Sequence, residues 1–328
     1  MSVADYFGYP PAAEAGNLPL SVSEKSPIAV FAYNRPEHLR RTLRSLKACE
    51  GFAGSTVTVF CDGPRSEEDR AAVEAARVVA REELDGAADI RLAPRNKGLA
   101  NSIIDGVGEL TERHGRVIVI EDDFDLAPGF LRFINAGLER FADNEKVFQV
   151  SGHMFDVPEF ATRDTALFLP MTTTWGWGTW KRAWRRFDPQ ASGWEALLTD
   201  RALRRRFNMG GVYDYTSMMV RQMSGRNDGW GIRWYWTVFR AGGVGLFPPR
   251  SLVRNTGFDG SGTHGAGRFR RFGGRQSLGD GEPIHLPEGP SADAVDDQHV
   301  LHLVRRAIWR QNGGWKGRMV DIVKRMFR

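Results

Sequence analysis

The chain has 328 residues, of which 41% are hydrophobic and 26% are charged, and its formal net charge at pH 7 is +5. This composition is typical of a soluble protein with a sizeable core, in one large α/β domain or two small ones. Two cysteines without a CxxC spacing exclude a disulfide scaffold and a cysteine-based zinc site. No signal-peptide pattern and no apolar run of membrane-spanning length is present, which predicts a cytoplasmic protein.

Strands and helices alternate from residue 27 onward. Continuous apolar runs predict strands at 28–33, 56–60, 89–94, 116–120 and 147–152, and amphipathic segments predict helices at 34–49, 66–84, 97–115 and 129–144. This order predicts a mostly parallel, Rossmann-like sheet with helices on both faces. After residue 153 the rhythm changes, with strands expected at 166–170 and 244–249 and helices near 212–225 and 230–243.

Four parts are therefore expected. They are a loosely packed lead-in (1–26), a first half with regular strand–helix alternation (27–152), a second half of the same domain with a different rhythm (153–300), and a basic tail (301–328).

Positive charge is concentrated in the tail. Residues 301–328 hold eight Lys and Arg against one Asp, a net charge of +7, so the other 300 residues sum to −2. This distribution argues against a nucleic-acid partner. From Trp315 onward the apolar side chains fall on one helical face and the basic ones largely off it. The pattern predicts a peripheral helix on the anionic inner face of the cytoplasmic membrane, or a helix docked on the body with its basic face outward.

Polar side chains follow each of the first four predicted strands. They are Tyr33 to Arg35, Asp62 with Gly63, Arg95 to Lys97, and Glu121 to Asp125. In parallel sheets the ligand site lies outside the carboxyl ends of the strands, so these clusters are expected at one edge. No GxGxxG follows the first strand, and no GxxxxGK[ST] is present, which argues against a dinucleotide-binding site of that type and against a P-loop.

The fourth strand ends in crowded acids. Residues 117–130 read VIVIEDDFDLAPGF, with four carboxylates within five positions. Like charges beside a buried strand repel, so positive charge must offset them. Basic side chains or a hard divalent cation could supply it, and the crowding favours a metal site.

Several motifs, in order, resemble bacterial GT-A glycosyltransferases close to family 2. They are FAYNRPEHLRRTL, VFCDGPR, RLAPRNKGLANSI, VIVIEDDFDLAPGFL, TTTWGWGTWKRAW, NDGWGIRWYWTVFRAGG and RNTGFDGSGTH, within residues 27–265. The EDD element is also similar to that of the N-acetylglucosaminyltransferase I group. The resemblance is specific for fold and reaction class and much less so for substrate. It implies that residues 27–152 form the half that binds a nucleotide-sugar donor, and residues 153–300 the acceptor-binding and catalytic half of the same domain.

On the donor side, the resemblance implies a divalent cation, Mn²⁺ or Mg²⁺, held by Asp123 and by His264 from a glycine-rich loop. Glu121 and Asp122 would contact the ribose or order the metal's surroundings, while Asp125 matches no ligand.

The nucleotide itself would lie between further side chains. Asp62 would accept a hydrogen bond from uracil N3–H, Arg95 would meet the diphosphate, and Tyr33 and Arg35 would line the pocket. The alternatives are a turn-forming role for Asp62 and a surface charge for Arg35.

On the acceptor side, the resemblance implies Asp228 as the general base. The alternatives are a helix N-cap role for Asp228, a base placed at the position of Gly231 in other chains, and Asp214. Trp175 and Trp177, flanked by glycines, are the candidates for sugar stacking, although most tryptophans of this stretch are expected in the core.

The expected activity is a metal-dependent, inverting transfer of a sugar from a nucleotide-diphosphate donor, preferably a UDP-sugar. The acceptor would be a glycan or a lipid-linked glycan in bacterial surface polysaccharide assembly, and the sugar a hexosyl or N-acetylhexosaminyl group. A sugar-phosphate nucleotidyltransferase and an inactive sugar-binding module are the alternatives.

Overall fold

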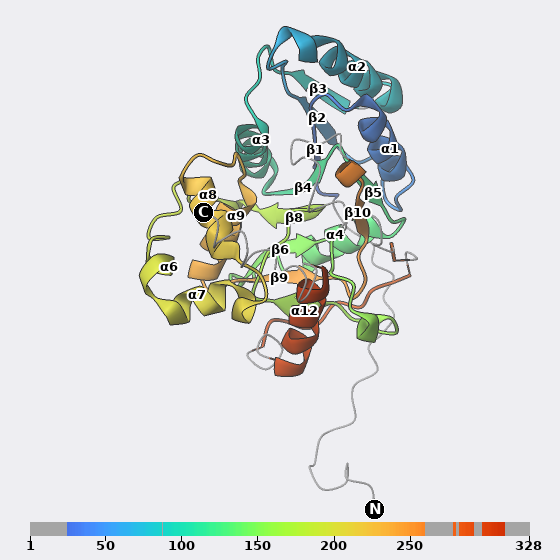
Figure 1. The fold of residues 1–328 in the computed structure, drawn as a ribbon. Helices are drawn as coiled ribbons and strands as arrows, with labels where there is room; N and C mark the ends of the chain where they lie inside the picture. Colours follow the sequence, from blue (N-terminus) through green and yellow to red (C-terminus); the bar gives the residue numbers. More distant parts are fainter. Residues whose placement is uncertain (1–24, 87, 260–277, 280–281, 292–296, 312–328) are drawn as a thin grey trace, which may run out of the picture.

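An eight-stranded sheet forms the centre of the computed structural model, which describes residues 25–86, 88–259, 278–279, 282–291 and 297–311 (Figure 1). The strand order is β3-β2-β1-β4-β8-β6-β9-β7. Within the described residues, β8 and β7 run antiparallel to their neighbours and the other strands of this sheet are parallel. The expected α/β class with a mostly parallel sheet is confirmed.

The predicted strands lie close to their expected places. Their observed bounds are β1 Ile28–Ala32, β2 Val57–Cys61, β3 Ala88–Leu92, β4 Arg116–Glu121, β6 Val147–Ser151, β7 Leu167–Leu169 and β9 Val244–Phe247. Since β3, β2, β1 and β4 are parallel neighbours, their carboxyl ends meet at one edge of the sheet. The polar clusters that follow these strands are therefore gathered there, as predicted.

Strand β8, Trp177–Trp180, was not predicted, and it separates β4 from β6. Gly178 in β8 allows helix α4 to pack closely on this strand. A Cβ at Gly178 would lie 2.9 Å from side-chain carbons of Ile134 and Leu138. A larger residue would push α4 off the sheet.

Helices cover both faces of the sheet. Because successive side chains of a strand point to opposite faces, the core has one cluster on each face. Ile28 and Val30 face α1, α2 and α4, whereas Ala29 and Phe31 face α3 and α9. The bounds are α1 Pro36–Lys47, α2 Glu67–Leu84, α3 Leu99–His114, α4 Phe130–Arg140 and α9 Gly231–Arg240. The remaining short helices are η2 Pro158–Phe160, α5 Lys181–Trp184, α6 Ala196–Thr199, α7 Arg201–Phe207, η3 Met209–Gly211 and α8 Tyr215–Met223.

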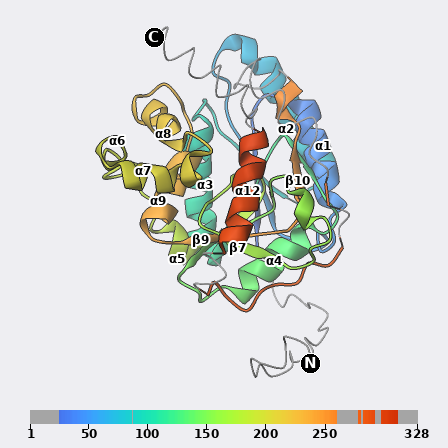
Figure 2. The same cartoon turned by 60° about the horizontal axis from the view of Figure 1, so that its bottom comes forward.

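Helix α12, Gln298–Gln311, docks on the body of the protein (Figure 2). Val304 and Ile308 are buried in one cluster with Leu167 of β7 and Phe247 of β9. Residues 301–311 thus pack on the body of the protein, whereas the predicted membrane helix was placed from Trp315 onward. The amphipathic segment that begins at Trp315 lies outside the described residues. No helix among the described residues is long and apolar enough to cross a membrane.

Strands β5 (Phe124–Leu126) and β10 (Val253–Asn255) form a separate antiparallel pair. Asp125 and Arg254 are opposite one another in this pair, and their side chains form an ion pair of 2.6 Å. The pairing brings the chain after β10, including 3₁₀ helix η4 (Gly257–Asp259), to the end of β4.

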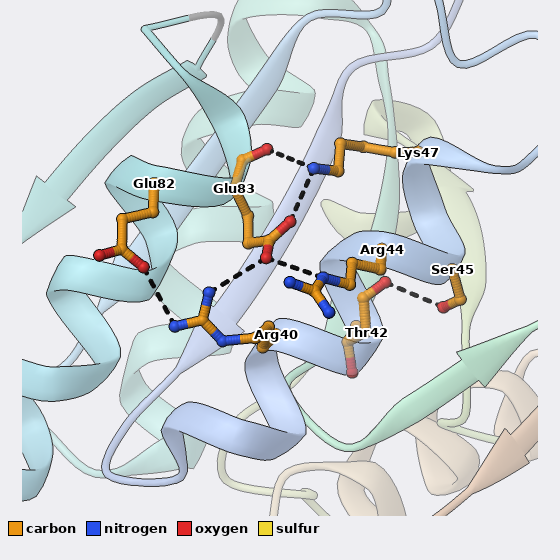
Figure 3. A network of polar contacts seen from close by, with 7 residues as sticks. All are labelled: Arg40, Thr42, Arg44, Ser45, Lys47, Glu82 and Glu83. Atoms are coloured by element: carbon orange, nitrogen blue, oxygen red, sulfur yellow. Dashed lines mark hydrogen bonds and ion pairs between the residues drawn. The ribbon is translucent and has the colours of Figure 1, made fainter.

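A charged network joins α1 to α2 beside the site (Figure 3). The Glu83 carboxylate accepts hydrogen bonds from Arg40, Arg44 and Lys47, at 3.1, 2.9 and 2.7 Å. These donors, above all Lys47, hold the pKa of Glu83 at about 2. Because α1 also contacts the acidic turn after β4, the network fixes one wall of the candidate site.

Glu83→Gln should lower the free energy of unfolding near neutral pH by about 1–3 kcal/mol, since hydrogen bonds to a charged group are lost. The pKa of Glu83 is lower in the folded protein than in the unfolded chain, where it is about 4.3. The stabilisation by the Glu83 carboxylate is therefore fully present above this unfolded-state pKa and is lost as the pH falls toward 2. Urea unfolding of wild type and variant from pH 7 to pH 3 measures this, and the difference should shrink below about pH 5. Glu82→Gln is the matched control, because Glu82 is more exposed and pairs only with Arg40 among the described residues. A difference independent of pH would contradict the assignment.

Candidate functional site

The acidic turn after β4 is held in place by helix α1. The Thr42 hydroxyl donates to the carbonyl oxygen of Asp122 at 2.9 Å and accepts from the backbone N–H of Phe124 at 3.0 Å. The Ser45 hydroxyl accepts from the N–H of Leu126 at 3.2 Å. Two hydroxyls on one face of α1 therefore fix the backbone that carries the carboxylates.

Arg35 is the cation that offsets these acids. Its Nη2 donates to Asp122 Oδ1 at 2.5 Å and to Asp123 Oδ2 at 3.0 Å. Burial lowers the pKa of Arg35, but the two carboxylates outweigh it and raise that pKa above its ordinary value. The sequence suggested two sources of positive charge, basic side chains or a divalent cation. The described residues include one basic side chain in this role, Arg35.

One guanidinium does not neutralise three carboxylates. Burial, together with the charges of Asp123 and Asp122, raises the pKa of Glu121 well above its ordinary range. Burial also raises the pKa of Asp122, although Arg35 opposes it. The raised pKa values mean that a further negative charge is disfavoured in the turn, so a proton or a cation that offsets it would be stabilised there.

The segment that follows β10, residues 256–259, lies over the turn and is called the strap. The backbone N–H and the hydroxyl of Thr256 both donate to the carbonyl oxygen of Asp123, at 2.8 and 3.0 Å. A Cβ at Gly257 would overlap Asp123 Oδ2 and lie 2.8 Å from Arg35 Nη1. Only glycine allows the strap to approach so closely.

The chemistry of the turn suits a hard cation. Asp123 Oδ1 is buried and has no hydrogen-bond partner among the described residues. A carboxylate oxygen is the ligand type that Mg²⁺ and Mn²⁺ take in proteins. No group of three or more His, Cys, Asp or Glu side chains in the described part of the chain could hold a metal ion, and His264 lies outside it. The unpartnered oxygen makes Asp123 suitable as one ligand of such a cation.

Asp62 clamps the loops that follow β2 and β3. Its carboxylate accepts from the N–H groups of Gly63, Lys97 and Gly98 and from the Asn96 amide, at 2.8 to 3.0 Å. A carboxylate has about four acceptor positions, and these bonds use that number. The turn-forming alternative accounts for the bond from Gly63, and the other three bonds come from the loop after β3. The predicted uracil contact would require an exchange of partners.

A groove of about 1000 Å³ opens beside this clamp. Asp62, Arg95, Asn96 and Lys97 line it together with the surface of β2, β3 and α3. Arg95 is exposed there, so its guanidinium can reach an anion. Tyr33 lies on the other side of the strand ends, where its hydroxyl donates to Asp69 at 2.6 Å.

Asp228 lies at the same end of the sheet, beside the start of α3. Its Oδ2 is 2.7 Å from the place where a Cβ of Gly98 would be. Asp228 is exposed and does not cap α9, whose N-cap is Trp230 without a side-chain bond. By contrast, Asp214 caps α8 through the N–H of Ser217 at 3.0 Å.

Gly231 has no room for a side chain, because a Cβ there would lie 2.6 Å from Thr174 Cγ2. A base at that position, the alternative open from the sequence, would not fit this backbone. Asp228 is thus an exposed carboxylate close to Gly98 at this end of the sheet.

The two candidate sugar-stacking residues differ in exposure. Trp177 is fully buried and stacks on Trp230 at 5.1 Å between ring centroids, so the predicted sugar contact of Trp177 is wrong in this conformation. Trp175 is half-buried and packs edge-on against His153 at 4.5 Å and against Phe258 of the strap at 5.6 Å. Trp175 thus lies near the acidic turn through the strap.

The strap is the part of the site that the sequence reasoning missed. Thr256 and Gly257 are in contact with Asp123 only because β10 pairs with β5, 127 residues earlier in the chain (253 − 126). Two three-residue strands give no periodic signal of their own. The only local hint is the RNTGFDG stretch itself, with its turn-type residues.

No family model matches the chain. Among solved structures, it is similar to a mannosyltransferase from Pyrobaculum calidifontis in complex with GDP-mannose and Mn²⁺ (13% identity, TM-score 0.39, covering 67% of this chain and 70% of that one). It is also similar to the galactosyltransferase LgtC with donor and acceptor sugar analogues (14%, 0.35, 67% and 73%). A third is glucosyl-3-phosphoglycerate synthase from Mycobacterium tuberculosis with Mn²⁺, UDP and product (10%, 0.30, 49% and 58%). At these identities and TM-scores the likeness establishes neither the family nor the reaction.

Gly257→Ala should lower the melting temperature, because the added Cβ would drive the strap away from Asp123 and Arg35. The expected loss of stability is about 1–3 kcal/mol, as for overpacking in a closely packed region. Gly279→Ala is the matched control, since a Cβ there meets its nearest atom, Leu252 Cδ2, at an ordinary 3.4 Å. Thermal unfolding of the three proteins compares them, and equal losses for both variants would contradict the close approach.

Proposed function

We propose that this protein is a metal-dependent glycosyltransferase of the GT-A type, which transfers a sugar from a nucleotide-diphosphate donor. One observation carries the proposal. A buried carboxylate oxygen, Asp123 Oδ1, lacks a hydrogen-bond partner among the described residues, and it belongs to an acidic turn at the carboxyl edge of a parallel sheet. Such an edge is where α/β proteins bind nucleotides.

The donor would lie along the strand ends. Asp123 holds a divalent cation, Mn²⁺ or Mg²⁺, which when bound offsets the charge of the diphosphate leaving group. His264 completes this set in the proposal, on the strength of the sequence motif alone. Arg95, exposed in the groove, binds the diphosphate, for which a guanidinium is suited.

The nucleobase is assigned from the motif around Asp62, which favours uracil. Since Asp62 already accepts four hydrogen bonds, one of them must be exchanged for the uracil N3–H. The groove beside the clamp gives the base a place next to this carboxylate. Tyr33, half-buried at the end of β1, lines the ribose side together with Glu121 and Asp122.

On the acceptor side, Asp228 removes the proton of the attacking hydroxyl. Its carboxylate is exposed and is not engaged as a helix cap, so it is accessible to a substrate hydroxyl. A single base of this kind suits inversion at the anomeric carbon. Trp175 offers an aromatic face for the acceptor. A glycan or lipid-linked acceptor in bacterial surface polysaccharide assembly is supported only by the sequence resemblance.

Asp123→Ala should abolish the metal-dependent part of donor binding, because it removes the free carboxylate oxygen. The measurement is the melting temperature with UDP, with and without Mn²⁺, since a ligand of the folded state raises it. Asp125→Ala is the matched control, because Asp125 pairs with Arg254 and is not part of the proposed metal site. An unchanged Mn²⁺-dependent shift in Asp123→Ala would refute the metal assignment.

Asp228→Asn should retain the Mn²⁺-dependent shift with UDP and lose about 10²–10⁴-fold in transfer rate, the usual contribution of a general base. The rate is read as UDP released from the sugar donor in the presence of acceptor. Asp214→Asn is the comparison, since asparagine also caps a helix and should leave the rate near that of the wild type. If Asp214→Asn loses the rate and Asp228→Asn keeps it, the base is assigned to the wrong residue.

A further inference from the structure

Arg35 contacts the carboxylates among which a metal would bind, and on Asp123 it holds Oδ2, the oxygen next to the unpartnered Oδ1. A single nitrogen, Nη2, bridges Asp122 Oδ1 and Asp123 Oδ2, at 2.5 and 3.0 Å. These two oxygens therefore converge on one point, and that point is held by a fixed positive charge. A divalent cation bound by Asp123 would lie about 2 Å from a carboxylate oxygen, and thus close to this nitrogen.

The pair is enclosed rather than spread over the surface. The side chains of Arg35, Asp122 and Asp123 are 20%, 6% and 11% exposed. On the strap side, Gly257 lies so close that a Cβ would be 2.8 Å from Arg35 Nη1. Two cations in so small and partly desolvated a space repel strongly, because little water separates their charges.

We propose that Arg35 is the built-in counter-ion of the metal-free site, and that a divalent cation binds by displacing its guanidinium from Asp122 and Asp123. This inference rests on the metal-dependent function proposed above. The negative charge of the acidic turn is then offset in both states, by the guanidinium in the metal-free site and by the cation in the metal-bound site. It also frees Arg35, next to the metal, for the diphosphate that the metal brings.

The exchange lowers the apparent affinity for metal alone. If the guanidinium holds the carboxylates in about nine molecules of ten, the apparent affinity falls about tenfold relative to the open site. A diphosphate that binds the released guanidinium recovers this loss, so metal and nucleotide favour each other. The site would then take up metal mainly together with its donor.

The test is the binding of Mn²⁺ alone to the full chain, stripped of metal with a chelator and followed by titration calorimetry. Arg35→Gln should bind Mn²⁺ about tenfold more tightly than the wild type, because the competing cation is gone. Its melting temperature without metal should be lower than that of the wild type, and Mn²⁺ should raise it by more.

Arg254→Gln is the matched control. It removes the same charge from the same corner of the molecule, but from a side chain that pairs with Asp125. Its affinity for Mn²⁺ should stay within about twofold of the wild type, because surface ion pairs contribute little. A gain equal to that of Arg35→Gln would overturn the exchange, since general electrostatics would then explain both.

Arg35→Lys keeps the exchange testable if Arg35→Gln does not fold. An ammonium group keeps the charge without the planar fork, so its Mn²⁺ affinity should lie between those of the wild type and Arg35→Gln. Equal or weaker binding by the Arg35 variants overturns the exchange but leaves the metal site standing. No Mn²⁺ binding by any of these proteins, with or without UDP, overturns the proposed function as well.

Discussion

The pairing of Arg35 with Asp122 and Asp123 is the interaction on which the rest of the site depends. Buried like charges at the end of β4 would repel one another without it, and the pKa values of Glu121 and Asp122 are raised even with it. The surrounding structure is arranged to hold this pair. Helix α1 fixes the turn through Thr42, and the strap after β10 approaches to a distance that only Gly257 permits. The Glu83 network fixes α1 against α2 in turn (Figure 3).

The sheet explains why residues so far apart in the sequence meet. Four parallel strands, β3, β2, β1 and β4, deliver their carboxyl ends to one edge. Asp62 uses this geometry to tie two successive loops together, and Gly98, one of its partners, lies against Asp228 from the second half of the chain. The donor-side and acceptor-side candidates are thus connected through a single clamped loop. A groove of about 1000 Å³ opens beside that loop.

Much of this was predictable because it is periodic. The continuous apolar runs located the first four strands, and their parallel order placed the polar clusters at one edge. The remainder depends on long-range contacts that leave no local pattern. Strand β8 lies in a tryptophan-rich stretch that has no strand pattern, and its Trp177 is part of the core. The pairing of β10 with β5 joins residues that are far apart in the chain. From the sequence, a metal was the favoured source of the charge that offsets the acids. The pairing of Arg35 with Asp122 and Asp123 was not predicted, because one arginine near a proline has no distinguishing signal.

The central claim is that the acidic turn after β4 is a metal-dependent nucleotide site. Its most direct test is the melting temperature of the wild-type protein with UDP, GDP, CDP or dTDP, each with and without Mn²⁺. A ligand that binds only the folded state raises this temperature. The account predicts a shift with one nucleotide, UDP, that requires Mn²⁺. No shift with any nucleotide in the presence of Mn²⁺, or an equal shift in its absence, would contradict it.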